Sequence, residues 1–319
     1  MIFRAVGLQT HIWNNNFKST LLLISFPLLI LAMMWTGGFL YFSTEPTFEN
    51  QASKLASTLV WQYWLYVFGG VLLWFVIAFF FHQDMIDAAS GAKFAERKDH
   101  EKIYNLLENL CISRGVTMPR IAIIDSSALN AFASGMTEKQ YTITLTSGLI
   151  NRLNDEELEA VLGHELSHII NRDVRLLVIS VIFVGILGFL AEAALHSKIR
   201  RGRKDGKMLI IALIILTVGY LIAVLMRFSL SRKREYLADA CSVDMTKNPD
   251  AMISALQKIS ADSEVEGIPK DVAQMCIENS RPSFFGVFAT HPPIKDRIHK
   301  LETLAGGKKE SSIVSSINN

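Results

Sequence analysis

The sequence predicts a mainly α-helical, polytopic membrane protein that also carries a soluble domain with a small β-sheet. Hydrophobic residues make up 50% of the 319 residues and the mean hydropathy is +0.29, which is too apolar for a typical soluble domain. The apolar residues are concentrated in long runs without charge. The polar blocks outside these runs contain helical and strand-like patterns, which predict the soluble domain.

Two charge-free runs near the amino terminus are long enough to cross a membrane. No Asp, Glu, Lys or Arg occurs from Ser19 to Thr44 or from Leu55 to Phe81, and about 20 helical residues cross the hydrocarbon core. The first run exceeds a signal-peptide core of about 7 to 15 residues and has no A-x-A site after it, so we expect a retained anchor. Basic residues flank the outer ends of the pair and only Lys54 lies between them, which predicts a cytoplasmic amino terminus and a cytoplasmic region after Phe81.

A second pair of apolar stretches, Leu176 to Leu195 and Met208 to Met226, is shorter but adequate for a membrane. The loop from Lys198 to Lys207 holds six basic residues and the outer flanks hold six as well, so the charge rule leaves the orientation of this hairpin open. Glu192 inside the first stretch should face protein, water or an interface. Full crossing and a shallow insertion both remain possible.

The polar residues fall in two blocks that together are large enough for one catalytic domain. The expected organisation is an amino-terminal transmembrane hairpin (1–82), a first part of the domain (83–175), the second hydrophobic hairpin (176–228), a second part of the domain (229–305) and a disordered tail (306–319).

Within the first block, apolar residues at helical spacing predict a helix from Asp99 to Gly115. Three short runs predict the strands of a small sheet: Arg120 to Ile124, Leu129 to Ser134 and Tyr141 to Leu145. Asn154 followed by three acidic residues has the composition of a helix start, so a helix should run from Asp155 to Asn171. In the second block the helices expected are Ser231 to Asp244, Pro249 to Ser260 and Pro292 to Leu304.

The helix that follows Asn154 carries the candidate chemistry. His164, Glu165 and His168 form an H-E-x-x-H sequence. Residues four apart on a helix differ by about 40° in azimuth and about 6 Å in rise, so both imidazoles can hold one metal ion. Glu165 projects beside them and can take a proton from a water that the metal activates, as metal-assisted peptide hydrolysis requires.

A catalytic zinc site needs a third protein ligand, and Glu235 is the candidate. It begins the segment Glu235-Tyr236-Leu237-Ala238-Asp239, in which Asp239 lies one turn from Glu235 and can accept a hydrogen bond from a ligating imidazole. Asp244 is a weaker candidate. The alternative for Glu235 and Asp239 is a solvated helix face that balances the basic residues just before it.

Charge and cysteine content exclude other classes of function. Lys plus Arg (32) against Asp plus Glu (30) gives a formal net charge of +2, which offers no support for a nucleic-acid partner. The three cysteines are widely spaced without a C-x-x-C, which argues against a disulfide framework and against a thiolate metal site.

The two apolar segments, the H-E-x-x-H helix, the apolar hairpin and the E-x-x-x-D helix, in this order, resemble the membrane-integrated zinc endopeptidases of the HtpX-like kind. These are gluzincin-type relatives of the CAAX prenyl endopeptidases. The resemblance covers most of the chain and implies a zincin-like α+β catalytic domain. It also implies that His164, His168 and Glu235 bind one Zn²⁺ per chain, that Asp239 supports a ligand, and that Glu165 is the general base.

Two further stretches resemble elements of this family. Asn130-Ala131-Phe132-Ala133-Ser134-Gly135 resembles the strand at the edge of the substrate cleft, which implies that Asn130, Ala131 and Phe132 bind substrate main chain. His291-Pro292-Pro293, with Arg297 six residues after the histidine, resembles a second element, which implies that His291 and Arg297 approach the oxyanion. The alternatives are a helix-capping histidine and a surface salt bridge of Arg297 with Asp296 or Glu302.

The function expected is a zinc-dependent endopeptidase of the bacterial inner membrane, with its catalytic domain in the cytoplasm. Its partners would be the lipid bilayer and extended or unfolded segments of proteins, including membrane proteins, and the resemblance implies a role in stress response and quality control. The oligomeric state stays open. The main alternative is an inactive, zinc-stabilised chaperone or binding protein, although such a protein would not need Glu165. An intramembrane protease and a zinc transporter are disfavoured, because the H-E-x-x-H helix begins with acidic residues and the apolar segments contain only Glu192.

Overall fold

A computed structural model describes residues 8–179, 182, 183, 217, 219, 233–260 and 292–304. The chain divides into two compact units. One contains Met1–His82 and Leu176–Ser229, and the other contains Gln83–Arg175 and Leu230–Asn319.

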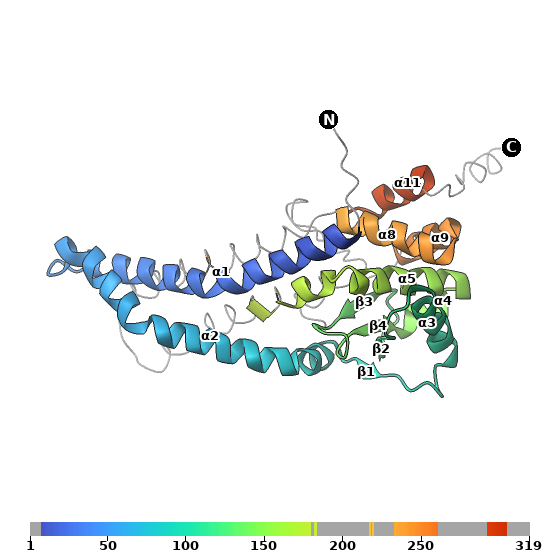
Figure 1. The fold of residues 1–319 in the computed structure, drawn as a ribbon, viewed down its shortest axis with the longest axis horizontal. Helices are drawn as coiled ribbons and strands as arrows, with labels where there is room; N and C mark the ends of the chain where they lie inside the picture. Colours follow the sequence, from blue (N-terminus) through green and yellow to red (C-terminus); the bar gives the residue numbers. More distant parts are fainter. Residues whose placement is uncertain are drawn as a thin grey trace. The chain divides into compact units, whose positions relative to one another are not determined.

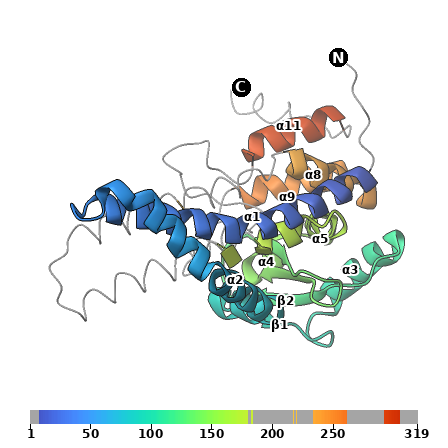
Figure 2. The same ribbon diagram turned by 60° about the vertical axis from the view of Figure 1, so that its left-hand side comes forward.

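The first unit is built on two long helices, α1 (Leu8–Ser43) and α2 (Ala52–Ser90), joined through a short 3-10 helix, η1 (Glu49–Gln51). Figures 1 and 2 show the two helices meeting at this connection. The stretches Asn15–Ser43 and Glu49–Ser90 are long and apolar enough to cross a membrane, with mean hydropathies of 2.0 and 2.2. Large apolar side chains on them are exposed, among them Trp61 at 79%, an arrangement that suits lipid and not water. The predicted second hairpin lies almost entirely outside the described residues.

The second unit contains a four-stranded mixed sheet with the order β1-β2-β4-β3. Its strands are β1 (Lys93–Phe94), β2 (Arg120–Ile124), β3 (Ala131–Ser134) and β4 (Thr142–Thr146). β2 runs parallel to β4, whereas β1 and β3 are antiparallel to their neighbours. The three predicted strands are present, and β1 was missed because two exposed residues carry no apolar pattern.

Five of the six described helices of this unit that follow α2 begin and end close to the predicted residues. They are α3 (Glu101–Arg114), α4 (Ser147–Arg152), α5 (Asp155–Ile170), α8 (Lys233–Thr246), α9 (Pro249–Ile259) and α11 (Ile294–Leu304). A capping box formed by Asn154 and Glu157 begins α5, and Gly115 at φ +63° ends α3. The short α4 was not predicted; its cap is the hydroxyl of Thr146, the last residue of β4.

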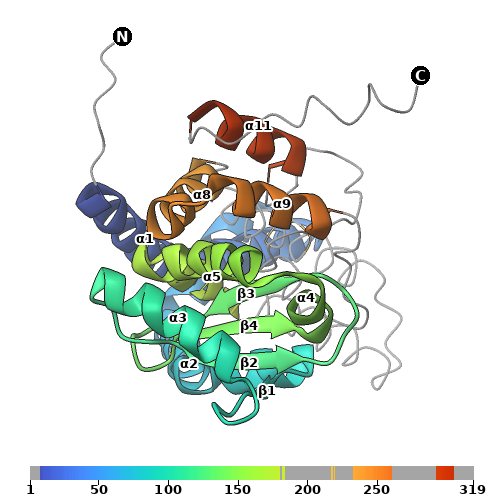
Figure 3. The ribbon, with the colours of Figure 1, turned by 90° about the vertical axis from the view of Figure 1, so that its right-hand side faces the viewer.

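Helix α5 is the centre of the second unit, as Figure 3 shows. It contacts the edge strand β3 on one side and α8 and α9 on the other. Gly163 of α5 faces Ser242 of α8, where an added Cβ would lie 3.1 Å from the serine hydroxyl, and Ser242 donates a hydrogen bond to the carbonyl of Ala160. Small residues at this crossing let the two helix backbones approach closely, so that side chains of α8 reach the H-E-x-x-H face of α5.

Candidate metal centre

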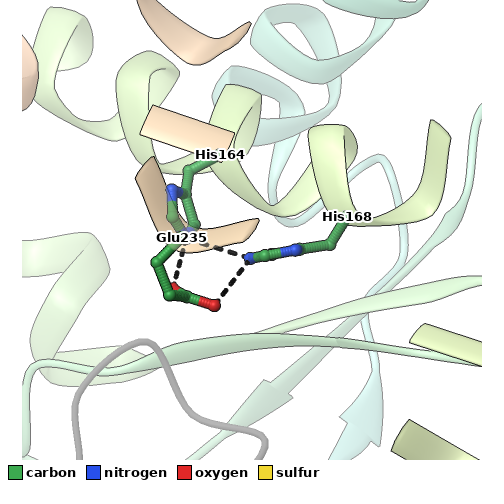
Figure 4. Close-up of side chains that lie close together, drawn as sticks. All are labelled: His164, His168 and Glu235. Atoms are coloured by element: carbon green, nitrogen blue, oxygen red, sulfur yellow. Dashed lines mark hydrogen bonds and ion pairs between the residues drawn. The ribbon is translucent and has the colours of Figure 1, made fainter. Parts of the chain in front are cut away.

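His164 and His168 lie one turn apart on the same face of α5, and Figure 4 shows their imidazoles turned toward each other. Their Nε2 atoms are 3.2 Å apart. In a tetrahedral zinc site with metal–nitrogen bonds of about 2.0–2.1 Å, neighbouring ligand atoms lie roughly 3.3 Å apart. The spacing of the two imidazoles therefore matches that of two ligands of one ion.

Glu235 reaches the same point from the first turn of α8. Its carboxylate oxygens lie 3.6 Å from Nε2 of His164 and 3.7 Å from Nε2 of His168. One ligand atom from each of the three residues falls within 4.8 Å of the others. Glu235 is only 4% exposed, so a solvated helix face is excluded for it. Two imidazole nitrogens and one carboxylate, buried and converging, are a donor set that fits a divalent metal ion.

A buried ion pair, formed by Asp239 and Arg297, contacts His164 on the Nδ1 side of its ring. Nδ1 of His164 lies 2.9 Å from Oδ1 of Asp239, and Arg297 donates to both oxygens of the same carboxylate at 2.9 and 2.7 Å. The salt bridge of Arg297 with Asp296 or Glu302, the alternative from sequence, is replaced by this pair. Since the contacts described for Arg297 lie on the Nδ1 side of His164, away from the ligand cluster, they lend no support to the predicted oxyanion contact.

Burial and the neighbouring charges shift the pKa values of His164 and Asp239 in opposite directions. Burial lowers the pKa of His164, but its hydrogen bonds to Asp239 and Glu235 outweigh this effect and raise the pKa to about 9. Burial raises the pKa of Asp239, but the charge of Arg297 and the hydrogen bond to His164 hold it below the usual value. A metal ion at Nε2 of His164 must displace a proton, so metal binding and protonation compete at this residue.

His168 has an equivalent partner that sequence reasoning missed. Its Nδ1 lies 3.1 Å from Oδ2 of Asp173, and Oδ1 of Asp173 accepts a hydrogen bond of 3.3 Å from Nη1 of Arg234. On a continuous helix a residue five positions on would lie about 140° away in azimuth from His168. Helix α5 ends at Ile170, and the turn that follows contains Arg172 at φ +58°. The feature of the sequence that could have identified this partner is a carboxylate just beyond the end of the helix.

The other predicted residues are placed as follows. Glu165 is 2% exposed and lies between the two histidines in the sequence of α5. Asn130 directly precedes β3, and its main-chain N–H and C=O are hydrogen-bonded to Thr146. Ala131 and Phe132 are buried in β3, which among the described strands pairs only with β4. His291 lies outside the described residues.

Asp244 does not join the metal centre. It is more than half exposed, and its partners are Arg114 and Lys247. Hydrogen bonds from Lys247 and Arg114 lower the pKa of Asp244 to about 2. The side chain ties α8 to α3 at the surface, so the weaker candidate for the third ligand is excluded.

A pocket of about 380 Å³ opens between α8, the start of α9 and α11. Asp239 and Arg297 line it, together with Tyr236, Lys247 and Lys300, but none of the three candidate ligands does. The pocket therefore borders the ion pair behind His164 and is separate from the ligand cluster.

Residues 97–305 match the sequence profile of Peptidase family M48. A "Protease HtpX homolog" of Bacteroides fragilis (strain YCH46) is 48% identical over 318 residues, covering 93% of this chain and 98% of the relative. A "Protease HtpX homolog" of Listeria monocytogenes serotype 4a (strain HCC23) is 33% identical over 274 residues, covering 77% and 89%. The crystal structure of S. mikatae Ste24p is 20% identical and covers 91% of this chain and 66% of its own, at a TM-score of 0.39. The predicted family and class of enzyme are confirmed: the chain belongs to peptidase family M48, and it is a membrane metallopeptidase.

Proposed function

We propose that the protein is a zinc-dependent endopeptidase that cleaves extended segments of unfolded or membrane proteins. The observation that carries this proposal is the convergence of His164, His168 and Glu235, with the two Nε2 atoms 3.2 Å apart. These three residues would hold one Zn²⁺ per chain. When bound, the ion polarises the scissile carbonyl and makes water a nucleophile at neutral pH.

Glu165 is the proposed general base. It directly follows His164 on α5 and is buried. A carboxylate in this place takes a proton from the attacking water and then delivers a proton to the leaving amine. Because a site that only stabilises the fold has no need of such a residue, Glu165 distinguishes a peptidase from a structural metal site.

Strand β3 is the proposed docking edge for the substrate. It is the last strand of the described sheet, next to β4, and it packs against α5, which carries the histidines. The outer edge of such a strand presents main-chain N–H and C=O groups that pair with an extended peptide whatever its side chains are. Asn130, Ala131 and Phe132 are the proposed contact residues. Because the main-chain N–H and C=O of Asn130 are bonded to Thr146, its contact would come from its side chain. Selection would then be for extended chain more than for sequence.

Two residues of the carboxy-terminal region have different proposed roles. His291 keeps the predicted role of stabilising the oxyanion. We propose a positioning role for Arg297, because two of its hydrogen bonds go to Asp239 and its Nη2 lies 3.5 Å from Nδ1 of His164. The cellular role proposed is quality control in the bacterial inner membrane, with the catalytic unit facing the cytoplasm, as the charge distribution around the first hairpin predicts.

The test is cleavage of an unfolded protein by detergent-purified enzyme, comparing wild type with Glu165→Gln and measuring bound metal in both. Glu159→Gln on the same helix is the matched control. We expect wild type and Glu159→Gln to cut and Glu165→Gln to keep its metal without cutting. Metal binding without cleavage by wild type on several unfolded and membrane substrates would favour a metal-stabilised binding protein. Absence of metal in wild type would contradict the ligand assignment.

A further inference from the structure

We propose that Asp173 is a positioning residue for the metal ligand His168 and that Arg234 acts through Asp173. The inference rests on the metal site proposed above and concerns how tightly that site holds its ion. Asp173 lies 3.1 Å from Nδ1 of His168, and Arg234 lies 3.3 Å from the other oxygen of the same carboxylate.

The carboxylate of Asp173 selects the tautomer of His168. A hydrogen bond from Nδ1–H to Oδ2 leaves the lone pair of Nε2 directed at the ligand cluster, where Nε2 of His164 lies 3.2 Å away. Such a partner also raises the basicity of the ligating nitrogen and restricts rotation of the ring. Restriction matters here because the side chain of His168 is 13% exposed, whereas that of His164 is 1% exposed and confined by packing.

Arg234 connects this carboxylate to the third ligand. It directly precedes Glu235 in α8, so the hydrogen bond from Arg234 to Asp173 joins the first turn of α8 to the residues just after α5. In the part of the chain that the structure describes, this is the hydrogen bond that its guanidinium makes, and its Nε is buried without an acceptor. The hydrogen bond therefore ties the residue before Glu235 to the carboxylate that faces His168.

The turn after α5 is what makes the contact with Asp173 possible. The helix ends at Ile170, Asn171 is its cap, and Arg172 adopts the left-handed φ of +58°. Helical structure resumes at residue 173. A non-glycine residue in this region is uncommon, and after this turn Asp173 lies beside His168.

The test uses the full chain in detergent, stripped of metal and titrated with zinc against a competing chelator. Asp173→Asn should raise the Kd for zinc about 10- to 100-fold and change the visible absorption of the cobalt-substituted protein, because the orientation of a ligand has changed. The matched control is Asp244→Asn, which removes an Arg–Asp pair between α8 and α3 that touches no ligand. The control should bind zinc like wild type.

Wild-type affinity and an unchanged cobalt spectrum in Asp173→Asn would overturn the proposal. If wild type itself binds no zinc, the metal site of the proposed function fails instead, so the two failures are distinguishable. Arg234→Gln keeps all three ligands and Asp173, and it decides the question if Asp173→Asn does not fold. We expect it to raise the Kd for zinc by roughly 10-fold, at the lower end of that range, and a Kd within twofold of wild type would contradict the role of Arg234.

Discussion

The two histidines of the metal centre are supported by the same kinds of residue in different surroundings. Each Nδ1 faces an aspartate, and each aspartate is paired with an arginine: Asp239 and Arg297 behind His164, Asp173 and Arg234 behind His168. The side chains of Asp239 and Arg297 are 2% and 0% exposed, whereas those of Asp173 and Arg234 are 6% and 16% exposed. We call the first set the buried arm and the second the rim arm.

The difference in burial assigns different roles to the partners of the two histidines in the H-E-x-x-H sequence. In the buried arm the ion pair lies between α8 and α11 in the interior, so removing Arg297 leaves the buried carboxylate of Asp239 with His164 as its remaining described partner. In the rim arm Asp173 is buried and Arg234 is 16% exposed, so we expect the loss of this pair to cost less folding free energy than the loss of the buried arm while still freeing the histidine to rotate. We therefore expect the buried arm to determine mainly the stability of the fold and the rim arm mainly the affinity for metal.

The largest expected effect is that of Arg297→Gln. Asp239 then keeps His164 but loses its arginine, so the free energy of unfolding should fall by about 3 kcal/mol, the lower end of the range for a broken buried pair. Thermal or chemical unfolding of the metal-free protein in detergent measures this change. Arg97→Gln, which breaks an exposed pair with Glu108, is the control and should leave the unfolding midpoint unchanged. An equally small shift for Arg297→Gln would remove the distinction between the arms.

The next largest loss of unfolding free energy is expected at Glu157, near the start of α5. The partners described for Glu157 include none of the candidate metal ligands, so its variant is a reference for the two arms. Glu157 is buried and accepts hydrogen bonds from Ser254, Lys258 and the main chain of Asn154. Glu157→Gln should therefore cost about 2 kcal/mol of unfolding free energy, because hydrogen bonds to a charged group are lost.

The pH dependence of that cost follows from the pKa of Glu157. Burial raises this pKa, but the hydrogen bonds from Lys258, Ser254 and Asn154 outweigh burial and hold it below 4.5. The stabilisation is present above pH 4.5 and is lost as the pH falls through the lowered pKa. Unfolding midpoints of wild type and Glu157→Gln should converge in acid, and a gap that does not narrow as the pH falls below 4.5 would contradict this account.

Arg234→Gln should have a smaller effect on folding. Because the hydrogen bond from Arg234 to the buried Asp173 is long, at 3.3 Å, and Arg234 is itself 16% exposed, we expect a loss of about 1 kcal/mol in the unfolding free energy of the metal-free protein. The same variant is expected to weaken zinc binding, so the two measurements on one protein sharpen the comparison. A loss as large as that of Arg297→Gln would show that the rim arm also stabilises the fold.

The smallest effect is expected for Asp244→Asn. Its pairs with Arg114 and Lys247 are exposed and screened by salt, so its contribution to the unfolding free energy should be about 0–1 kcal/mol and should disappear at high ionic strength. Unfolding in low and high salt measures it. A large effect that is independent of salt would mean that exposure does not predict how much an ion pair contributes to the unfolding free energy. The comparison of the two arms would then lose its basis.

Local sequence patterns predicted most of the regular elements because their causes lie within a few residues. The capping residues Asn154 and Glu157, the stop at Gly115 and the one-turn spacing of His164 and His168 all act within one helix. The same patterns did not predict β1, which has two exposed residues, or α4, whose cap is the last residue of a strand.

By itself, the sequence determined the charge-free length of the amino-terminal segments, the helix that carries H-E-x-x-H, and the candidate third ligand Glu235. The tertiary structure alone decided that Arg297 would bond Asp239 from 58 positions away and that Arg234 would bond Asp173 from 61 positions away. Periodicity gives the direction of a side chain around its own helix, but not the neighbour that it meets. That neighbour depends on how closely α8 packs against α5 at Gly163 and on the turn at Arg172. The partners of the two histidines therefore follow from packing between distant segments.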